Sequence, residues 1–155
     1  MAIETGKKAK EFTAFSGSGK KITLSDFKGK WIVLYFYPKD NTSGCTEEAC
    51  SFRDNMGRIT KSGAIVIGVS PDSVKSHDGF KEKYSLNFIL VSDEEKSICK
   101  AYDVLGEKSL YGRKYIGVIR STYIIDAQGI VRHVFSNVKV DGHVDEVIAK
   151  LKELH

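Results

Sequence analysis

Two apolar runs dominate the hydrophobic pattern of this chain. Residues 31–37 and 64–69 are almost wholly apolar and show no alternation with polar positions. This pattern is typical of strands that are buried on both faces of a sheet. Between the runs, apolar side chains recur with helical spacing at Cys45, Ala49, Phe52, Met56 and Ile59. A helix between two buried strands predicts a βαβ unit with parallel strands.

The remaining pattern predicts shorter elements. Helices are expected at 73–84, at 93–102 after a capping box in residues 92–95, and from Asp141 or Gly142 onward. Strands are expected at 21–24, 87–91, 122–125 and 130–135, the last two joined as a hairpin by residues 126–129. The glycine-containing stretch 103–119 is interpreted as a long loop. This order predicts an α/β fold, with residues 1–155 as a single domain.

Composition restricts the class of protein. The chain has 155 residues, of which 41% are hydrophobic and 28% charged, as in ordinary soluble domains. No run approaches the ~18 apolar residues that span a bilayer, and residues 1–10 lack the apolar segment of a secretory signal. We therefore expect no membrane association and a cytoplasmic location, or an organellar one if a transit peptide has been removed.

Charge and cysteine content narrow the chemistry. The net charge is +4, and no basic stripe suited to nucleic acid is present. The three cysteines, Cys45, Cys50 and Cys99, are an odd number, and we expect no export signal. This favours redox or metal chemistry over a disulfide scaffold. A metal site is disfavoured, because two cysteines five residues apart lack the short spacings and further ligands that metals require.

Cys45 is placed where a buried strand gives way to a helix. The start of a helix has unpaired N–H groups and a positive dipole, which favour the reactive thiolate. The neighbouring charges add nothing, because Lys39 and Asp40 cancel and Glu47 and Glu48 are anionic. A cation must therefore come from elsewhere in the fold.

Arg120 is the best candidate for that cation. It immediately precedes the strand expected at residue 122. If that strand lies antiparallel to residues 31–37, its beginning lies beside the end of the buried strand, where the Cys45 loop starts. Less constrained alternatives are Arg113, Lys114 and Arg53. Two further residues are expected to assist: Thr42 as a hydroxyl donor to the thiolate, and Pro38 as a cap that excludes water.

Cys50 poses a problem of distance. Residues five apart on an ideal helix have Cα atoms roughly 8.7 Å apart and point about 140° away from each other. A disulfide needs Cα atoms closer than about 7 Å. Bonding between Cys45 and Cys50 therefore requires the first turns of the helix to unwind.

These motifs resemble those of the peroxiredoxins, in particular the bacterioferritin-comigratory-protein or peroxiredoxin Q subfamily. The family pattern Pro-x-x-x-Thr-x-x-Cys is met by Pro38, Thr42 and Cys45, and the subfamily pattern extends over residues 37–50. Further matching segments are residues 68–72, 106–109, 111–112 and 120–126. Ser43 departs from the proline that many subfamily members have.

The resemblance implies a thioredoxin-like fold, with a central mixed sheet flanked by helices. It implies a thiol-dependent peroxidase for hydrogen peroxide and organic hydroperoxides, active in antioxidant defence, with Cys45 as the peroxidatic cysteine. Thr42 and Arg120 would hold the peroxide, and Glu48 would orient Arg120. Cys50 would be the resolving cysteine, forming an intramolecular disulfide that thioredoxin or a similar dithiol reduces. No metal or organic cofactor is needed.

Other interpretations remain open at this point. A thioredoxin-like disulfide oxidoreductase would normally need a Cys-x-x-Cys pair, whereas the spacing here is Cys-x-x-x-x-Cys. A non-enzymatic peroxide sensor would use the same cysteine. Cys99 is interpreted as a packed free thiol, and no role is assigned to His77, His133, His143 or His155. The resemblance favours a monomer or weak dimer.

Overall fold

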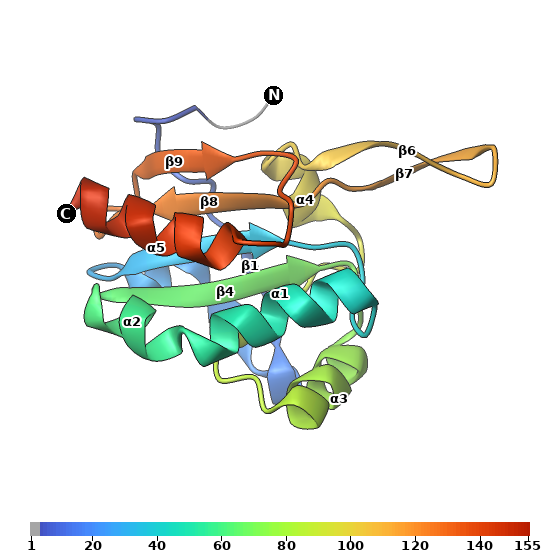
Figure 1. The fold of residues 1–155 in the computed structure, drawn as a ribbon, viewed down its shortest axis with the longest axis horizontal. Helices are drawn as coiled ribbons and strands as arrows, with labels where there is room; N and C mark the ends of the chain where they lie inside the picture. Colours follow the sequence, from blue (N-terminus) through green and yellow to red (C-terminus); the bar gives the residue numbers. More distant parts are fainter. Residues whose placement is uncertain (1–3) are drawn as a thin grey trace.

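The computed structural model describes residues 4–155. Seven strands form the main sheet in the order β2-β1-β5-β4-β3-β8-β9. They are β1 (Thr13–Ser16), β2 (Lys21–Thr23), β3 (Trp31–Phe36), β4 (Ala64–Ser70), β5 (Ile89–Ser92), β8 (Ser121–Ile125) and β9 (Val131–Phe135). Figure 1 labels β4, β8 and β9 of this sheet. The α-helices are α1 (Ser43–Asp54), α2 (Met56–Lys61), α3 (Val74–Tyr84), α4 (Ser97–Ala101) and α5 (His143–Leu154). Short 3-10 helices are η1 (Gly17–Gly19) and η2 (Leu24–Phe27).

The centre of the sheet confirms the predicted βαβ unit. Strand β3 pairs in parallel with β4 on one side and antiparallel with β8 on the other. The antiparallel register sets Phe36 opposite Ser121, so the residue before β8 lies beside the loop that leaves β3. The helix expected between the strands is two helices, because the chain leaves helical geometry at Asn55, whose side chain donates to the Ser51 carbonyl.

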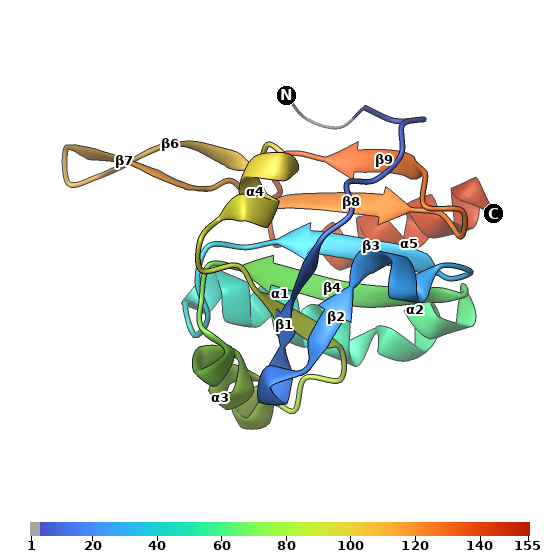
Figure 2. The same cartoon turned by 180° about the vertical axis from the view of Figure 1, so that it is seen from behind.

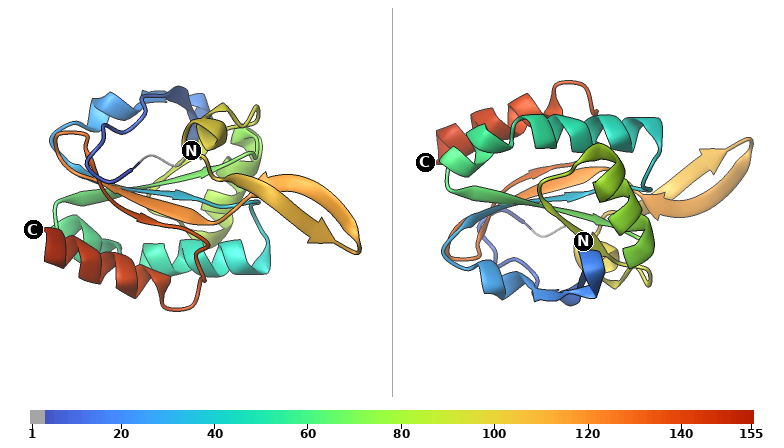
Figure 3. Two further views of the ribbon diagram at one scale, coloured as in Figure 1. Left: turned by 90° about the horizontal axis from the view of Figure 1, so that it is seen from above. Right: turned by 90° about the horizontal axis from the view of Figure 1, so that it is seen from below.

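Helices cover both faces of the sheet. Helices α1, α2 and α5 lie together on one face (Figure 3). On the opposite face, α4 and the N-terminal segment cross the strands (Figure 2). Alternate residues of β3 therefore enter two different apolar clusters, Leu34 and Phe36 on the α4 side and Val33 and Tyr35 on the α1 side. Burial on both faces explains why β3 shows no apolar–polar alternation.

The expectation of a loop over residues 103–119 is wrong. This stretch forms a two-stranded hairpin, β6 (Leu105–Leu110) and β7 (Arg113–Val118), which projects from one end of the sheet (Figure 1). Its turn has Tyr111 and Gly112 in left-handed conformation, with φ of 51° and 78°. Such two-residue turns match the twist of a hairpin. Because both strands are largely exposed, no buried face leaves an alternating pattern in the sequence.

Two smaller expectations also fail. The helix predicted at 93–102 spans only Ser97–Ala101, because residues 93–96 form a turn and the Asp93 carboxylate accepts hydrogen bonds from the N–H groups of Ile98 and Cys99. Strand β1 was not predicted.

The helices expected at 73–84 and near residue 142 are confirmed as α3 and α5. Among residues 4–155, no helix has the length and apolar character to cross a bilayer.

Candidate active site

Cys45 lies in the first turn of α1 and is almost fully buried, with 1% of its surface exposed. Thr42 is the N-cap of this helix, and its carbonyl accepts the first helical hydrogen bond, from the Thr46 N–H. The thiol therefore sits close to the positive end of the helix dipole. Cys45, Cys50 and Cys99 are all free thiols, so the structure represents the reduced protein.

Arg120 brings a cation to this sulfur. Its Nη2 donates to Cys45 Sγ at 2.9 Å, and its Nη1 donates to Glu48 Oε1 at 2.9 Å. The position follows from the β3–β8 register, because Arg120 directly precedes β8 beside the end of β3. The predicted approach of Arg120 to Cys45 is confirmed, as is its contact with Glu48. One planar guanidinium thus contacts the sulfur and the carboxylate together.

Burial controls the balance of charge in this group. The Glu48 side chain is 1% exposed and that of Arg120 is 18% exposed. Burial raises the pKa of Glu48 to about 7, although the charge and hydrogen bond of Arg120 act in the opposite direction. Burial thus opposes full neutralisation of Arg120 by Glu48.

The other candidate cations have different positions. Arg53 donates to the Tyr84 carbonyl and pairs with Asp54, and Arg113 and Lys114 lie exposed on β7. Lys108, which the sequence did not single out, is closer to the site. Burial and the charge of Arg120 lower the pKa of Lys108, while Cys45 raises it. Strand β6 therefore brings one amine close enough to interact electrostatically with Arg120 and Cys45.

Thr42 and Pro38 frame the loop before α1. The Thr42 hydroxyl donates to the Lys39 carbonyl at 2.9 Å. The sequence predicts that this proton points toward Cys45. In the structure it points into the loop instead. The oxygen keeps free lone pairs, which can accept a hydrogen bond from a hydroperoxide. Pro38 is half-buried directly after β3.

The other two cysteines differ in access. Cys50 is half-buried in α1 and faces an open groove of about 350 Å³ that is also lined by Glu47, Asp54 and Asp141. Cys99 has no exposed surface. Burial, reinforced by Asp93, raises the pKa of the Cys99 thiol far above its usual range. Cys99 is therefore a packed, unreactive thiol, as expected.

Sequence reasoning missed two features of the site. A Cβ atom on Gly44 would lie 2.9 Å from Arg120 Nη2, so the absence of a side chain there permits the guanidinium to reach the sulfur. The only signal was a glycine next to Cys45. Asp40 and His77 form a buried pair beneath the same loop, and nothing in the sequence pattern joins these two positions.

Comparison with known proteins identifies the family. The AhpC/TSA family matches residues 5–134. The chain belongs to this family. It is 46% identical over 154 residues to the Bacillus subtilis peroxiredoxin Bcp, covering 99% of this chain and 98% of the relative. Within the family it is thus a peroxiredoxin of the Bcp or peroxiredoxin Q type, and a peroxidase.

Solved structures confirm the thioredoxin-like fold of a peroxiredoxin. The Xylella fastidiosa PrxQ, determined as a cysteine-to-serine variant, superposes with a TM-score of 0.93 at 39% identity, covering 99% of this chain and 98% of the other. The Xanthomonas campestris bacterioferritin comigratory protein, determined as trapped intermediate and ligand complexes for its alkyl peroxide reduction activity, gives a TM-score of 0.87 at 43% identity. That match covers 92% of this chain and 90% of the other.

The Gly44 contact predicts a loss of activity without a loss of stability. In Gly44→Ala, the new methyl group displaces the flexible end of Arg120, and we expect the rate of Cys45 oxidation by peroxide to fall roughly 10-fold or more. The free energy of unfolding should stay constant or rise by up to about 1 kcal/mol, because alanine favours a helix. Stopped-flow oxidation and urea unfolding measure the two effects. Gly57→Ala in α2, where a Cβ meets nothing within 4 Å, is the matched control; a Gly44→Ala protein with full activity would contradict the prediction.

Glu48 predicts a pH-dependent stability. The folded protein holds the Glu48 proton more tightly than the unfolded chain does, because burial raises the pKa from 4.5 to about 7. This contribution is fully present below about pH 4.5 and is lost as the pH rises through about 7. We expect the stability of Glu48→Gln relative to wild type to increase by on the order of 2–3 kcal/mol between about pH 4.5 and pH 8.

Urea unfolding of wild type and Glu48→Gln across this pH range measures the difference between their free energies of unfolding. The titrating groups that the two proteins share contribute equally to both and cancel in this difference. Glu47→Gln, a change at an exposed neighbour in α1, is the matched control for the loss of a carboxylate. A difference that stays constant with pH would show that Glu48 does not titrate in this range.

Proposed function

We propose that this peroxidase is thiol-dependent and that Cys45 is the residue that attacks the peroxide. The observation that carries the proposal is the double contact of Arg120, 2.9 Å from Cys45 Sγ and 2.9 Å from Glu48 Oε1. A cation held at a buried sulfur favours the thiolate, which is the nucleophile. The alkyl peroxide reduction activity named for the Xanthomonas relative supports organic hydroperoxides as substrates, beside hydrogen peroxide.

The first step transfers one oxygen atom. The Cys45 thiolate attacks the nearer peroxide oxygen, the O–O bond breaks, and the farther oxygen leaves as an alkoxide or hydroxide that takes up a proton. Cysteine becomes a sulfenic acid, and the peroxide becomes an alcohol or water. Arg120 is placed to stabilise the charge as it moves from sulfur to the leaving oxygen. Thr42 would accept a hydrogen bond from the peroxide, and Pro38 would limit access of water.

The second step forms a disulfide. The Cys50 thiol condenses with the sulfenic acid of Cys45, releasing water and joining the two sulfur atoms. Both cysteines lie in the continuous helix α1, and both are free. The spacing of five residues keeps their Cα atoms roughly 8.7 Å apart while the helix is intact. The first turns of α1 must therefore unwind before the bond forms.

The third step regenerates the thiols. A thioredoxin or similar dithiol attacks the Cys45–Cys50 disulfide and reduces it by exchange. The groove beside Cys50 leaves this position accessible. We place the cycle in the cytoplasm, where such dithiols are kept reduced, and expect a monomer or weak dimer that needs no metal or organic cofactor.

Removal of the attacking thiol tests the first step. Cys45→Ser should abolish hydroperoxide consumption in an assay with thioredoxin, thioredoxin reductase and NADPH, because a serine hydroxyl is not ionised at neutral pH. Cys99→Ala, which removes the buried thiol on the opposite face of the sheet, is the matched control and should retain turnover. Full turnover by Cys45→Ser would overturn the assignment of the peroxidatic cysteine.

Removal of the resolving thiol tests the second and third steps. Cys50→Ser should reduce one equivalent of peroxide per chain and then stop, because the sulfenic acid of Cys45 has no internal partner. The burst and the missing steady state are measured by peroxide consumption, and the trapped sulfenic acid by mass spectrometry. Continued recycling by thioredoxin would show that another thiol resolves the intermediate.

A further inference from the structure

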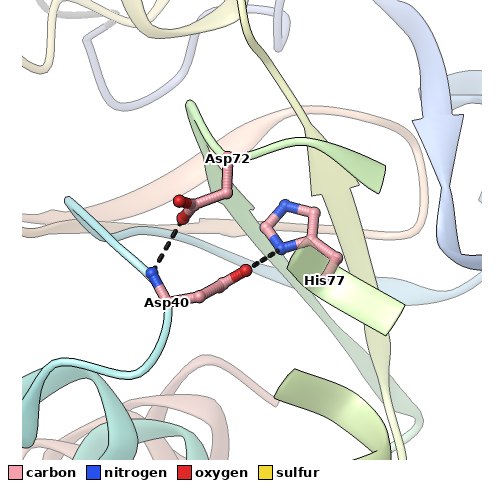
Figure 4. A group of neighbouring side chains, drawn as sticks. All are labelled: Asp40, Asp72 and His77. Carbon is pink, nitrogen blue, oxygen red and sulfur yellow. Dashed lines mark hydrogen bonds and ion pairs between the residues drawn. The ribbon is translucent and has the colours of Figure 1, made fainter. Parts of the chain in front are cut away.

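A buried acid–histidine pair lies beneath the loop that leads to α1 (Figure 4). Asp40 belongs to this loop, and His77 belongs to α3. His77 Nδ1 is 2.7 Å from Asp40 Oδ2, and the two side chains are 0% and 1% exposed. Neither residue contacts the Cys45–Arg120–Glu48 group through a described hydrogen bond, so the pair is a separate feature.

Every polar atom at His77 Nδ1 is an acceptor. The closer one is Asp40 Oδ2, at 2.7 Å. The farther one is the Tyr37 hydroxyl oxygen, at 3.5 Å. Tyr37 directs its own proton to Asp40 Oδ1, at 2.7 Å, so it offers only lone pairs to the ring. Nδ1 must therefore carry a proton, or share one with Asp40.

The same holds at the other ring nitrogen. His77 Nε2 is 3.0 Å from the Val91 carbonyl oxygen, which can only accept. The Ser70 hydroxyl lies 3.5 Å away and directs its proton to Asp72 Oδ2, at 2.6 Å. A neutral imidazole carries a proton on only one nitrogen, so the lone pair of the other nitrogen would face an acceptor oxygen. That contact is unfavourable, and a proton on both nitrogens removes it.

The surroundings of Asp40 favour a carboxylate over a protonated acid. Its Oδ2 also accepts from the Ser76 hydroxyl at 2.8 Å, and its Oδ1 accepts from the Tyr37 hydroxyl. Two hydroxyl donors, independent of the ring, thus act on this buried carboxyl and stabilise its ionised form. The proton between Asp40 and His77 is therefore placed on the ring.

We propose that His77 is a buried imidazolium paired with the Asp40 carboxylate, and that this pair is a positioning device for the loop that carries Thr42 to the start of α1. The catalytic half of the proposal rests on the proposed function of Cys45. Within residues 38–42, Asp40 is the one buried residue. The pair fixes this otherwise exposed loop to α3, while the Asp40 N–H donates to Asp72 Oδ2 at 2.8 Å.

The local conformation of the loop shows why such an anchor is needed. Asn41 adopts the left-handed region with φ of 63°, and the Thr42 hydroxyl bonds only to Lys39, within the loop itself. The side-chain bonds of Asp40 to His77 and Ser76 of α3, together with its N–H bond to Asp72, therefore tie this loop to the rest of the fold. A shift of about 1 Å in that starting point is enough to misplace a nucleophile and lower its rate as much as 100-fold.

A metal ion is the competing interpretation of the same three residues. Ligand atoms of Asp40, Asp72 and His77 all lie within 4.8 Å of one another. A histidine that binds a metal must be deprotonated at the ligating nitrogen. An imidazolium carries a proton on both ring nitrogens, whereas a ring nitrogen that binds a metal carries none. Measuring the protonation of the His77 ring therefore separates the two interpretations.

The first experiment reads the ring directly in the reduced wild-type protein. With ¹⁵N-labelled histidine, both His77 ring nitrogens should appear protonated and protected from exchange. Addition of Zn²⁺ should leave these signals unchanged. An unprotonated Nδ1, or a Zn²⁺-dependent shift of the His77 ring signals, would overturn the proposal, and neither result depends on peroxidase activity.

The second experiment tests positioning, using Asp40→Asn, His77→Gln and the double variant. We expect each single change to slow oxidation of Cys45 by peroxide roughly 10-fold or more, with the double variant no slower than the worse single one, because the pair acts as a unit. Formation of the Cys45–Cys50 disulfide should be unchanged or faster, since the anchor does not aid unwinding.

Asp145→Asn and His133→Gln remove an exposed acid on α5 and a half-buried histidine on β9, and serve as matched controls. Folding of each variant is checked by urea unfolding. Peroxide oxidation at the wild-type rate in folded Asp40→Asn and His77→Gln, or an equal slowing of both steps, would overturn the positioning role. If the wild-type protein itself does not react with peroxide through Cys45, the proposed function is wrong. The ¹⁵N measurement of His77 remains valid in that case, because it does not depend on activity.

Discussion

The guanidinium of Arg120 is the contact on which the site depends. It joins Cys45 and Glu48, one turn apart on α1, to the start of β8. Three features of the fold serve this contact. Strand β8 runs antiparallel to β3, so Arg120 arrives at the end of β3 where the loop to α1 starts. Gly44 has no side chain to obstruct the guanidinium. Burial raises the pKa of Glu48 and so opposes its neutralisation of the guanidinium.

The sequence predicted those parts of the fold and the site that depend on local periodicity or on strand register. The apolar runs of β3 and β4 predict the buried centre, and an antiparallel β8 then places Arg120 near Cys45. The hairpin of β6 and β7 was missed because its largely exposed strands carry no apolar–polar alternation. His77 was missed for a related reason: its partners Asp40 and Val91 come from distant segments, and a polar residue buried by tertiary contacts looks, in sequence, like one on the surface. Lys108 was missed because it lies on the unpredicted strand β6.

Helix α1 has two requirements that oppose each other. In the proposed cycle it holds Cys45 rigidly against Arg120 while the peroxide reacts, and it then unwinds so that Cys45 can meet Cys50. The anchor that we propose upstream of the helix would reconcile them, because Asp40 pairs with His77 of α3 and lies before the first residue of α1. The unwinding is then confined to the residues that follow Thr42, and the upstream loop is still in place when the helix forms again.

The side chains that leave the core during unwinding also keep its cost low. The buried apolar residues in the first turns of α1 are small, Cys45 and Ala49, whereas the large Phe52 lies beyond Cys50. Exposing a small side chain forfeits about 1 kcal/mol, against 3 kcal/mol or more for removing a phenylalanine from a core. In the proposed unwinding, Glu48 leaves the core with them, and the desolvation that raises its pKa would be relieved. Above about pH 7 this relief would favour the unwound helix, so in the proposed cycle the same buried acid that holds Arg120 would also aid disulfide formation.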